Sequence, residues 1–237
     1  MNILTELENF INEFNTNSNE DFAIDTIRVE YSKQHKKSKL DNLGKWKKIN
    51  ANDRKILSKL KKGLTTDEIT TAYQLENHNI YYYNSSNPPK YLKATMVIFG
   101  IKQYHKEPPP RNIIESILNI LVFGTSKVQI NIDVCLDLAY KPSLTKLQEL
   151  YKTTKYKTST YINNLDIPMI EKIIIYDKQL KNNLDFSIWR VEAKILIPNI
   201  KYLALPLYEF QELINLVRDK QALQIAKEIT KWPKNKL

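Results

Sequence analysis

The sequence is poor in the residues that build disulfides and zinc sites. It contains one cysteine and three histidines in 237 residues. A lone cysteine excludes an internal disulfide and fits a reducing cytoplasm, and the histidines are too dispersed for a zinc site. No apolar run approaches the roughly 18 residues of a membrane span, and the acidic, amphipathic start MNILTELENFINEF lacks the basic region of a signal peptide. We therefore expect a soluble cytoplasmic protein that does not enter a membrane.

Acidic residues are scarce relative to basic ones. The chain has 36 Lys and Arg against 26 Asp and Glu, a net charge of +10 and a pI near 9.4. An AT-rich genome would favour Lys, Asn and Ile, but the same bias would raise glutamate as well. The surplus therefore favours a polyanionic partner, and DNA is the expected one. The lysine-rich stretch at residues 33–48 is expected to be an exposed loop, in which Lys36, Lys37 and Lys39 either contact DNA phosphates or are simply solvated.

Hydrophobic periodicity predicts an α+β fold. The expected helices cover residues 2–14, 52–62, 112–123, 143–151 and 206–231, and a further helix opens at the capping box Thr65–Glu68. The expected strands cover residues 23–31, 79–83, 91–103, 128–140, 158–162, 172–178 and 188–197. A strand, a crossover helix and a second strand within residues 91–140 form a split βαβ-like core. We expect a mainly antiparallel sheet with helices on one face and a long C-terminal helix.

Two portions of the chain are expected. Residues 1–75 form a helical and strand portion with a possible role in contacting DNA, and residues 76–237 form an α+β catalytic-type domain. Residues 53–74 also fit a helix-turn-helix, although two ordinary surface helices are the favoured interpretation. The sequence contains no convincing internal repeat; Arg-Val-Glu occurs at residues 28–30 and 190–192, but a three-residue match is weak evidence.

Three of the predicted strands carry polar side chains on one face. Residues two apart share a side of a strand. In residues 128–138 the polar side holds Asp133 and Asp137, and in residues 188–197 it holds Arg190, Glu192 and Lys194. In the strand between them, Lys172, Ile174, Tyr176 and Lys178 share a face. If the strands lie in one sheet, these groups converge on a possible reaction surface.

These segments occur in a recognisable order: Ile132-Asp133-x-x-x-Asp137, Thr160-Tyr161-Ile162-Asn163, Tyr176-Asp177-Lys178 and Arg190-x-Glu192. The series resembles the replication initiation factor family of rolling-circle plasmid and filamentous-phage proteins, which shows R-I-D-x-x-x-D, T-x-Y-x-G, Y-D-K or Y-E-K, and R-x-E strands in that order. Two positions depart from the pattern, because Asn131 replaces the usual arginine and Asn163 the usual glycine. The His-hydrophobe-His pair of the commoner rolling-circle nickases is absent.

The resemblance implies sequence-selective nicking of one DNA strand at a plasmid or phage origin. A tyrosine would attack a phosphodiester to leave a 5′-phosphotyrosine and a free 3′-OH, and a divalent Mg²⁺ or Mn²⁺ would polarise the phosphate. Tyr176 is the expected nucleophile. The roles of the other residues are metal ligation for Asp133, Asp137 and Glu192, and phosphate binding or neutralisation for Lys178, Arg190 and Lys194. No Gly-x-x-x-x-Gly-Lys-Ser/Thr motif occurs, so strand separation would need a partner such as a host helicase.

Several alternatives stay open at the level of sequence. Tyr161 and Tyr208 are rival nucleophiles among 14 tyrosines. Asp133 and Asp137 lie roughly 13 Å apart along a strand, too far to share one ion, and Glu192 would also suit a cross-strand ion pair. A non-catalytic origin-binding or regulatory protein of the same fold is the main alternative function. An interaction protein whose charge reflects codon usage is the third.

Overall fold

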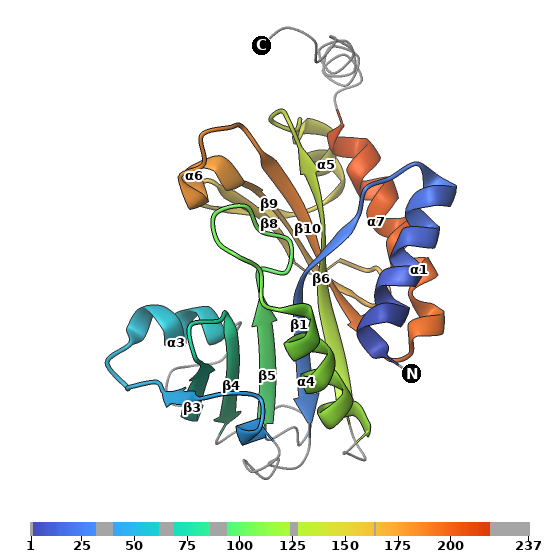
Figure 1. Ribbon diagram of the computed structural model, residues 1–237. Coiled ribbons are helices and arrows are strands. Elements are labelled where there is room, and N and C mark those ends of the chain that lie inside the picture. The colour runs from blue at the N-terminus through green and yellow to red at the C-terminus, as the bar shows by residue number, and fades with distance from the viewer. Residues whose placement is uncertain are drawn as a thin grey trace, which may run out of the picture. The chain divides into compact units, whose positions relative to one another are not determined.

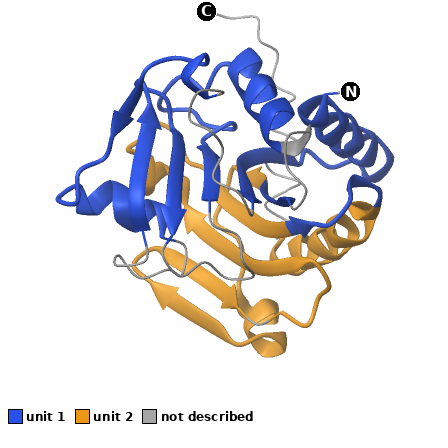
Figure 2. Cartoon of the chain, turned by 90° about the horizontal axis from the view of Figure 1, so that it is seen from below, with its two compact units in different colours: residues 1–134, 196–201 blue, residues 135–195, 202–237 orange. Residues whose placement is uncertain are grey.

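The computed structural model describes residues 2–31, 40–61, 69–85, 94–123, 128–163 and 165–218. Contacts divide the chain into two compact units, shown in Figure 2. Unit 1 comprises Met1–Val134 and Leu196–Lys201, and unit 2 comprises Cys135–Ile195 and Tyr202–Leu237. Within the described ranges, no helix has the length and apolar character needed to cross a bilayer. The division by role expected after residue 75 is not tested by these units and stays a prediction.

Ten strands form a sheet of order β2-β3-β4-β5-β1-β6-β10-β9-β8-β7. The strands are β1 (Ala23–Tyr31), β2 (Trp46–Lys48), β3 (Ile69–Leu75), β4 (Ile80–Ser85), β5 (Ala94–Phe99), β6 (Val128–Leu138), β7 (Thr153–Tyr156), β8 (Ser159–Asn163), β9 (Ile170–Asp177) and β10 (Trp189–Ile197). The helices are α1 (Ile3–Ser18), α3 (Arg54–Leu60), α4 (Arg111–Phe123), α5 (Thr145–Leu150), α6 (Lys178–Asn182) and α7 (Ala204–Val217), with a 3₁₀ turn at Ile200–Tyr202. The predicted α+β class with a mainly antiparallel sheet is confirmed (Figure 1).

The same topology occurs twice along the chain. From β1 to α4 the strands lie in the order β1-β5-β4-β3-β2, and from β6 to α7 they lie in the order β6-β10-β9-β8-β7. Each half therefore places its first strand beside its fifth and ends in a helix. The fourth strands correspond as well: Tyr83 of β4 pairs with Thr95 of β5, and Tyr176 of β9 pairs with Arg190 of β10. The repetition is one of topology, which explains why sequence comparison alone does not find it.

The halves differ in how their second and third strands connect. In the first half, β2 and β3 are separated by a long segment that contains α3. In the second half, Lys157 and Thr158 alone join β7 to β8, and Tyr156 pairs directly with Ser159. The helix α3 is therefore an addition that the five-stranded arrangement itself does not require.

The helices of unit 1 cover two groups of apolar side chains. Helix α1 packs against α4 and β1, and the side chain of its N-cap residue Asn2 accepts a hydrogen bond from the Leu4 N–H. Helix α3 buries Leu57 and Leu60 against Tyr81 and other residues of β4 and β5. Strand β1 lies between β5 and β6, and α4 connects those two strands. This is the split βαβ-like core that the sequence predicts.

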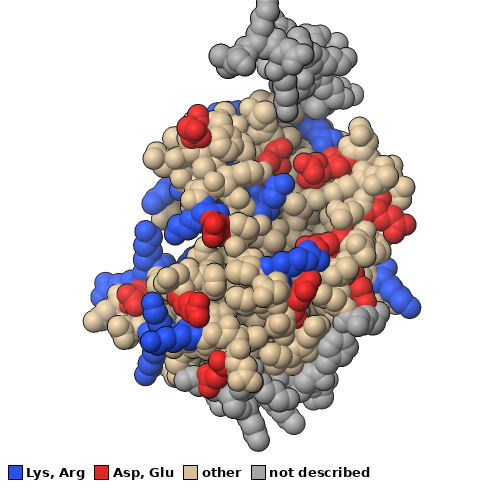
Figure 3. Space-filling model, viewed as in Figure 1, with Lys and Arg blue, Asp and Glu red and all other residues tan. Residues whose placement is uncertain are grey.

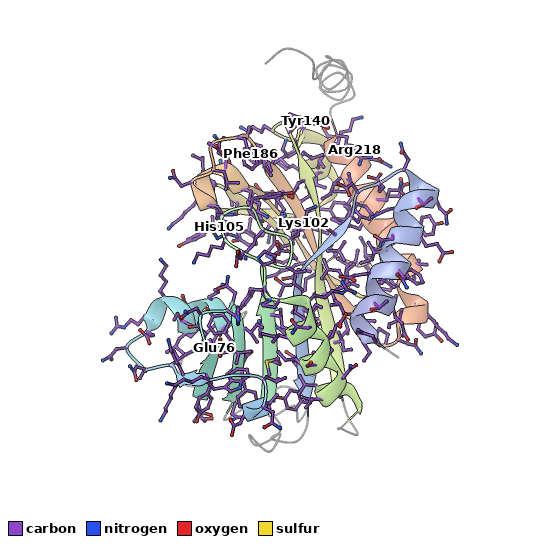
Figure 4. All side chains as sticks on the ribbon, in the orientation of Figure 1. Glu76, Lys102, His105, Tyr140, Phe186 and Arg218 are labelled. Carbon is purple, nitrogen blue, oxygen red and sulfur yellow. The ribbon has the colours of Figure 1, made fainter. Side chains whose placement is uncertain are left out.

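In unit 2, α5 packs against α7, and the Ser143 N–H donates a hydrogen bond to the Val217 carbonyl. Figure 4 labels Tyr140 and Arg218 at this end of the unit, just beyond the ends of β6 and α7. The predicted terminal helix is thus present as α7. Its expected continuation through residues 219–231 lies outside the described residues.

One predicted helix is wrong. The capping-box signature predicts a helix after Thr65, but Ile69–Leu75 is the strand β3. The β-branched residues Ile69, Thr70 and Thr71 favour a strand, and pairing with β4 provides the hydrogen bonds. A helix-turn-helix at residues 53–74 is excluded by this strand, and its turn lies outside the described residues. The short elements β2, β7 and α6 were not predicted.

Candidate active site

The register of β9 and β10 sets the geometry of the candidate site in unit 2. Tyr176 lies opposite Arg190, Ile174 opposite Glu192, and Lys172 opposite Lys194. These six residues share one face, because side chains alternate along each strand. The alternation in the sequence predicted this arrangement correctly for the strand residues.

Arg190 is completely buried and forms a bidentate ion pair with Asp137. Its Nε donates to Asp137 Oδ1 at 2.6 Å, and its Nη2 donates to Asp137 Oδ2 at 2.7 Å. The side chain of Arg190 is 0% exposed and that of Asp137 is 14% exposed. Paired N–H groups that meet both oxygens of a carboxylate form the strongest class of side-chain hydrogen bond. In this structure Asp137 is the counter-ion of Arg190, so the carboxylate predicted as a metal ligand is already engaged.

Tyr176 has a carboxylate at its hydroxyl and a cation over its ring. The Tyr176 hydroxyl donates to Glu192 Oε2 at 3.3 Å. The Lys181 ammonium lies 4.0 Å from the centroid of the Tyr176 ring. A carboxylate can accept the phenolic proton, and a nearby cation stabilises the phenoxide that remains. Tyr176 itself is only 4% exposed.

Helix α6 positions that cation. Asp177 is its N-cap residue, and the Asp177 side chain accepts a hydrogen bond from the Leu180 N–H at 2.9 Å. Asp177 of the Tyr-Asp-Lys motif therefore starts a helix. Lys178 is the first residue of α6, not a strand residue, and is buried. The predicted strand therefore ends one residue early, at Asp177, and the phosphate role of Lys178 stays a prediction.

Lys181 was not predicted as part of the site. No hydrophobic period marks a five-residue helix, and Asp177 as a possible N-cap was the only signal in the sequence. Lys194, predicted to bind phosphate, forms a short ion pair with Glu171 instead. Lys181 and Lys194 both belong to unit 2. The phosphate-binding role of Lys194 stays a prediction.

The polar row continues towards the outer strands of unit 2. Ser159 of β8 lies opposite Tyr176, and Tyr156 of β7 lies opposite Ser159. Tyr156 is 64% exposed. Tyr161, the rival nucleophile, lies opposite Ile174 and is half-buried. Three tyrosines of differing exposure thus share this face.

The sequence also singles out residues that belong to unit 1. Asp133 is buried on β6. Asn131, which stands where the resembling family has arginine, is also buried, and neither atom of its amide has a hydrogen-bond partner. Lys36, Lys37 and Lys39 lie outside the described residues.

The described residues do not gather a metal site. No group of three His, Cys, Asp or Glu side chains within them is arranged to hold an ion. Asp137 binds Arg190, and Glu192 accepts from Tyr176. Of the histidines, His78 lies beside Glu76 and His105 lies in the connection between β5 and α4 (Figure 4). The ligation of Mg²⁺ or Mn²⁺ by Asp133 and Glu192, with Asp137 as a third ligand, stays a prediction.

Comparison with known proteins gives one structural similarity. No protein-family model matches the chain, and no curated protein matches it. The chain is similar to the structure of a rolling circle replication initiator protein from Geobacillus stearothermophilus, with a TM-score of 0.35 and 13% identity over 74% of each chain. Similarity at this level does not assign a function, which must be argued from the residues of this chain.

Proposed function

We propose that the protein is a DNA replication initiator that nicks one strand of an origin by tyrosine attack on a phosphodiester. The observation that carries the proposal is the setting of Tyr176, whose hydroxyl donates to Glu192 and whose ring lies under the Lys181 ammonium. A phenol has a pKa near 10 and is a poor nucleophile at neutral pH without such help. The motif order around Tyr176 and the net charge of +10 support the same function.

The proposed reaction transfers the proton of the Tyr176 hydroxyl to Glu192. The phenolic oxygen then forms a bond to phosphorus while the bond from phosphorus to the 3′ oxygen breaks. The 3′ oxygen leaves and takes up a proton, giving a 3′-OH that can prime synthesis and a 5′-phosphotyrosine link. Lys181 offsets the negative charge that develops at the phenolic oxygen. A divalent ion remains an expectation from the family resemblance, and no step here depends on it.

Burial favours the alternative function, a DNA-binding protein without nicking activity. Tyr176 is almost completely buried, and the guanidinium of Arg190 is ion-paired with Asp137. An attack by Tyr176 therefore requires the groups that cover its hydroxyl to move. Tyr156 is more accessible on the same row and is the substitute nucleophile that exposure alone would select.

The test is a search for a covalent adduct. The full chain is incubated with supercoiled DNA that carries its own replicon, with Mg²⁺, with Mn²⁺ or with a chelator, and denaturing gels detect nicked circles and protein–DNA adducts. We expect an adduct that Tyr176→Phe abolishes and Glu192→Gln strongly reduces. Tyr202→Phe removes an exposed hydroxyl outside the row and is the matched control.

Each other outcome has a definite meaning. An adduct that survives Tyr176→Phe and is lost in Tyr161→Phe or Tyr156→Phe keeps the enzyme and moves the nucleophile. DNA binding without any nick under either metal supports the non-catalytic alternative. An absence of DNA binding at physiological salt rejects both functions.

A further inference from the structure

A basic groove lies between α3 and β3 in unit 1. Its volume is about 810 Å³, and its cationic lining residues are Lys48, Arg54 and Lys61. None of the described residues that line it is acidic. The charges of this described lining are thus all positive within a concave surface, which concentrates the electrostatic potential and attracts anions.

The segment that contributes these cations carries a local surplus of positive charge. Residues 45–61 contain seven Lys and Arg and one acid, Asp53, a net +6 in a chain whose total is +10. Figure 3 shows Lys and Arg side chains at the lower left of the view, where α3 and its neighbouring strands lie, with Asp and Glu side chains among them. Codon usage would spread lysine along the chain, so a local surplus of this size points to a ligand.

The remaining lining of the groove suits a phosphate backbone. Asn50, Ser58, Thr70 and Thr71 supply neutral polar groups beside the cations. Strand β2 pairs only with Tyr73, Gln74 and Leu75, so the start of β3 extends beyond β2 and lines the groove. Protein–DNA contacts to phosphate commonly use this mixture of Lys, Arg, Ser, Thr and Asn side chains. The lining residues that the structure describes include no aromatic ring on which a base could stack.

The helix that forms the groove is firmly held. Leu60 is fully buried, and Leu57 packs into the same cluster with Tyr81 and Phe99. The Lys59 ammonium lies 4.3 Å from the centroid of the Phe99 ring. The helix therefore presents its charges from a packed position. The second half of the chain forms the same strand order with a two-residue turn in place of the segment that contains α3.

We propose that the α3–β3 groove binds the sugar–phosphate backbone of DNA through Lys48, Arg54 and Lys61. It holds the DNA without reading its sequence. The proposal deepens the proposed function and rests on it for the identity of the nucleic acid. It adds a binding site on unit 1 that is separate from the chemistry of Tyr176.

The test is the salt dependence of DNA binding by the full chain. Fluorescence anisotropy with a labelled single strand and a labelled duplex measures affinity across a range of salt concentrations. The variant K48Q/R54Q/K61Q should bind more weakly, and its slope of log affinity against log salt should fall by about two to three for the duplex, at about 0.9 per phosphate contact. The arm with the larger loss identifies the form of DNA that the groove holds.

Matched variants separate the groove from general charge. K146Q/K152Q/K201Q removes three exposed lysines outside the groove and should leave the slope nearly unchanged. Ala51 is exposed and lines the groove, so Ala51→Glu should weaken binding while Ala51→Gln does not. Circular dichroism confirms that each variant is folded.

Three results would overturn the proposal: an unchanged slope in K48Q/R54Q/K61Q, an equal loss in the control triple variant, or poly-glutamate binding as tightly as DNA. Nicking is scored separately, by the covalent-adduct assay on the parent protein. If the salt slope falls in K48Q/R54Q/K61Q but the parent protein forms no adduct, the nicking function is rejected and the DNA-binding role of the groove is supported. If the parent protein forms an adduct but the salt slope of K48Q/R54Q/K61Q is unchanged, the nicking function is supported and the DNA-binding role of the groove is rejected.

Discussion

Two buried arginines, Arg28 and Arg190, each lie beside a tyrosine, and the two tyrosines lie on the corresponding strands β4 and β9. Arg190 is opposite Tyr176 and is neutralised by Asp137. Arg28 donates through Nη1 to the Tyr83 hydroxyl at 2.6 Å, but its Nε and Nη2 atoms have no hydrogen-bond partner. A buried charge is costly unless it is paired. The Asp137–Arg190 pair is therefore the position where loss of one partner should matter most.

Asp137→Ala should lower the free energy of unfolding by about 3–5 kcal/mol, because it leaves the Arg190 guanidinium buried without a counter-ion. The double variant D137L/R190M should recover most of that loss by replacing the ion pair with apolar contacts. Urea unfolding monitored by circular dichroism measures both. A loss below 1 kcal/mol in Asp137→Ala would show that water reaches Arg190.

Asn131→Leu should raise the free energy of unfolding. Both polar atoms of the Asn131 amide are buried without a partner, and each such atom costs about 1–3 kcal/mol. Leucine is similar in size and removes both. The measurement is again a urea midpoint, and a midpoint that falls would mean that the amide is hydrogen-bonded in solution.

At the scale of elements, the short helix α6 links local structure to the candidate site. It starts at Lys178 after the Asp177 cap, and it carries Lys181 over the Tyr176 ring. Five residues are too few for a helix to be stable by itself, so the cap contributes directly to the position of the ammonium.

Asp177→Ala should destabilise the protein by about 0.5–2 kcal/mol, the usual cost of losing an N-cap side chain. Asp177→Ser keeps an oxygen acceptor and should cost much less. Thermal unfolding followed by circular dichroism compares the two. Equal losses of stability in Asp177→Ala and Asp177→Ser would show that the carboxylate charge, and not the capping hydrogen bond, stabilises the protein.

Long, strongly periodic elements were predictable, and short ones were not. The strand at residues 23–31 and the helix beginning near Asn2 follow from hydrophobic spacing alone. At residues 69–75 the capping box predicts a helix, but the β-branched residues that follow it favour the strand that forms. Strands of three or four residues, such as β2 and β7, carry too little periodicity to be recognised.

The candidate site was predictable only in part, for a related reason. Alternation within a strand predicts that Tyr176, Arg190 and Glu192 share a face, and the register of β9 and β10 confirms it. Alternation says nothing about what covers that face. The burial of Arg190 and its pairing with Asp137 depend on segments far apart in sequence, and the contribution of Lys181 depends on a helix without a sequence signature.

At the scale of the whole molecule, tyrosines buried in unit 1 link stability to alkaline pH. Burial raises the pKa of Tyr31, Tyr81 and Tyr82 above the ordinary value. The folded state therefore favours their neutral form. This contribution to stability is fully present below the unfolded pKa of about 10 and is lost as the pH rises from there through the folded pKa values.

The protein should therefore unfold cooperatively above about pH 10, as the buried phenols are forced to ionise. Tyrosinate absorbance from the buried Tyr31, Tyr81 and Tyr82 should rise together with the loss of the circular dichroism signal. A single phase near the ordinary phenol pKa with an intact fold would contradict the prediction.

The repeated topology also sets the order in which the chain can fold. In each half the last four strands are a run of neighbours that pair as they emerge, as β2-β3-β4-β5 and β7-β8-β9-β10. The first strand must wait, because Thr26 of β1 pairs with Phe99 of β5 at the far end of its half. Closing that long loop loses chain entropy before any contact repays it. Each half thus consists of a four-stranded meander, which should form quickly, and a first strand, which should dock later. We therefore expect the docking of β1 and of β6 to be the slow steps of folding.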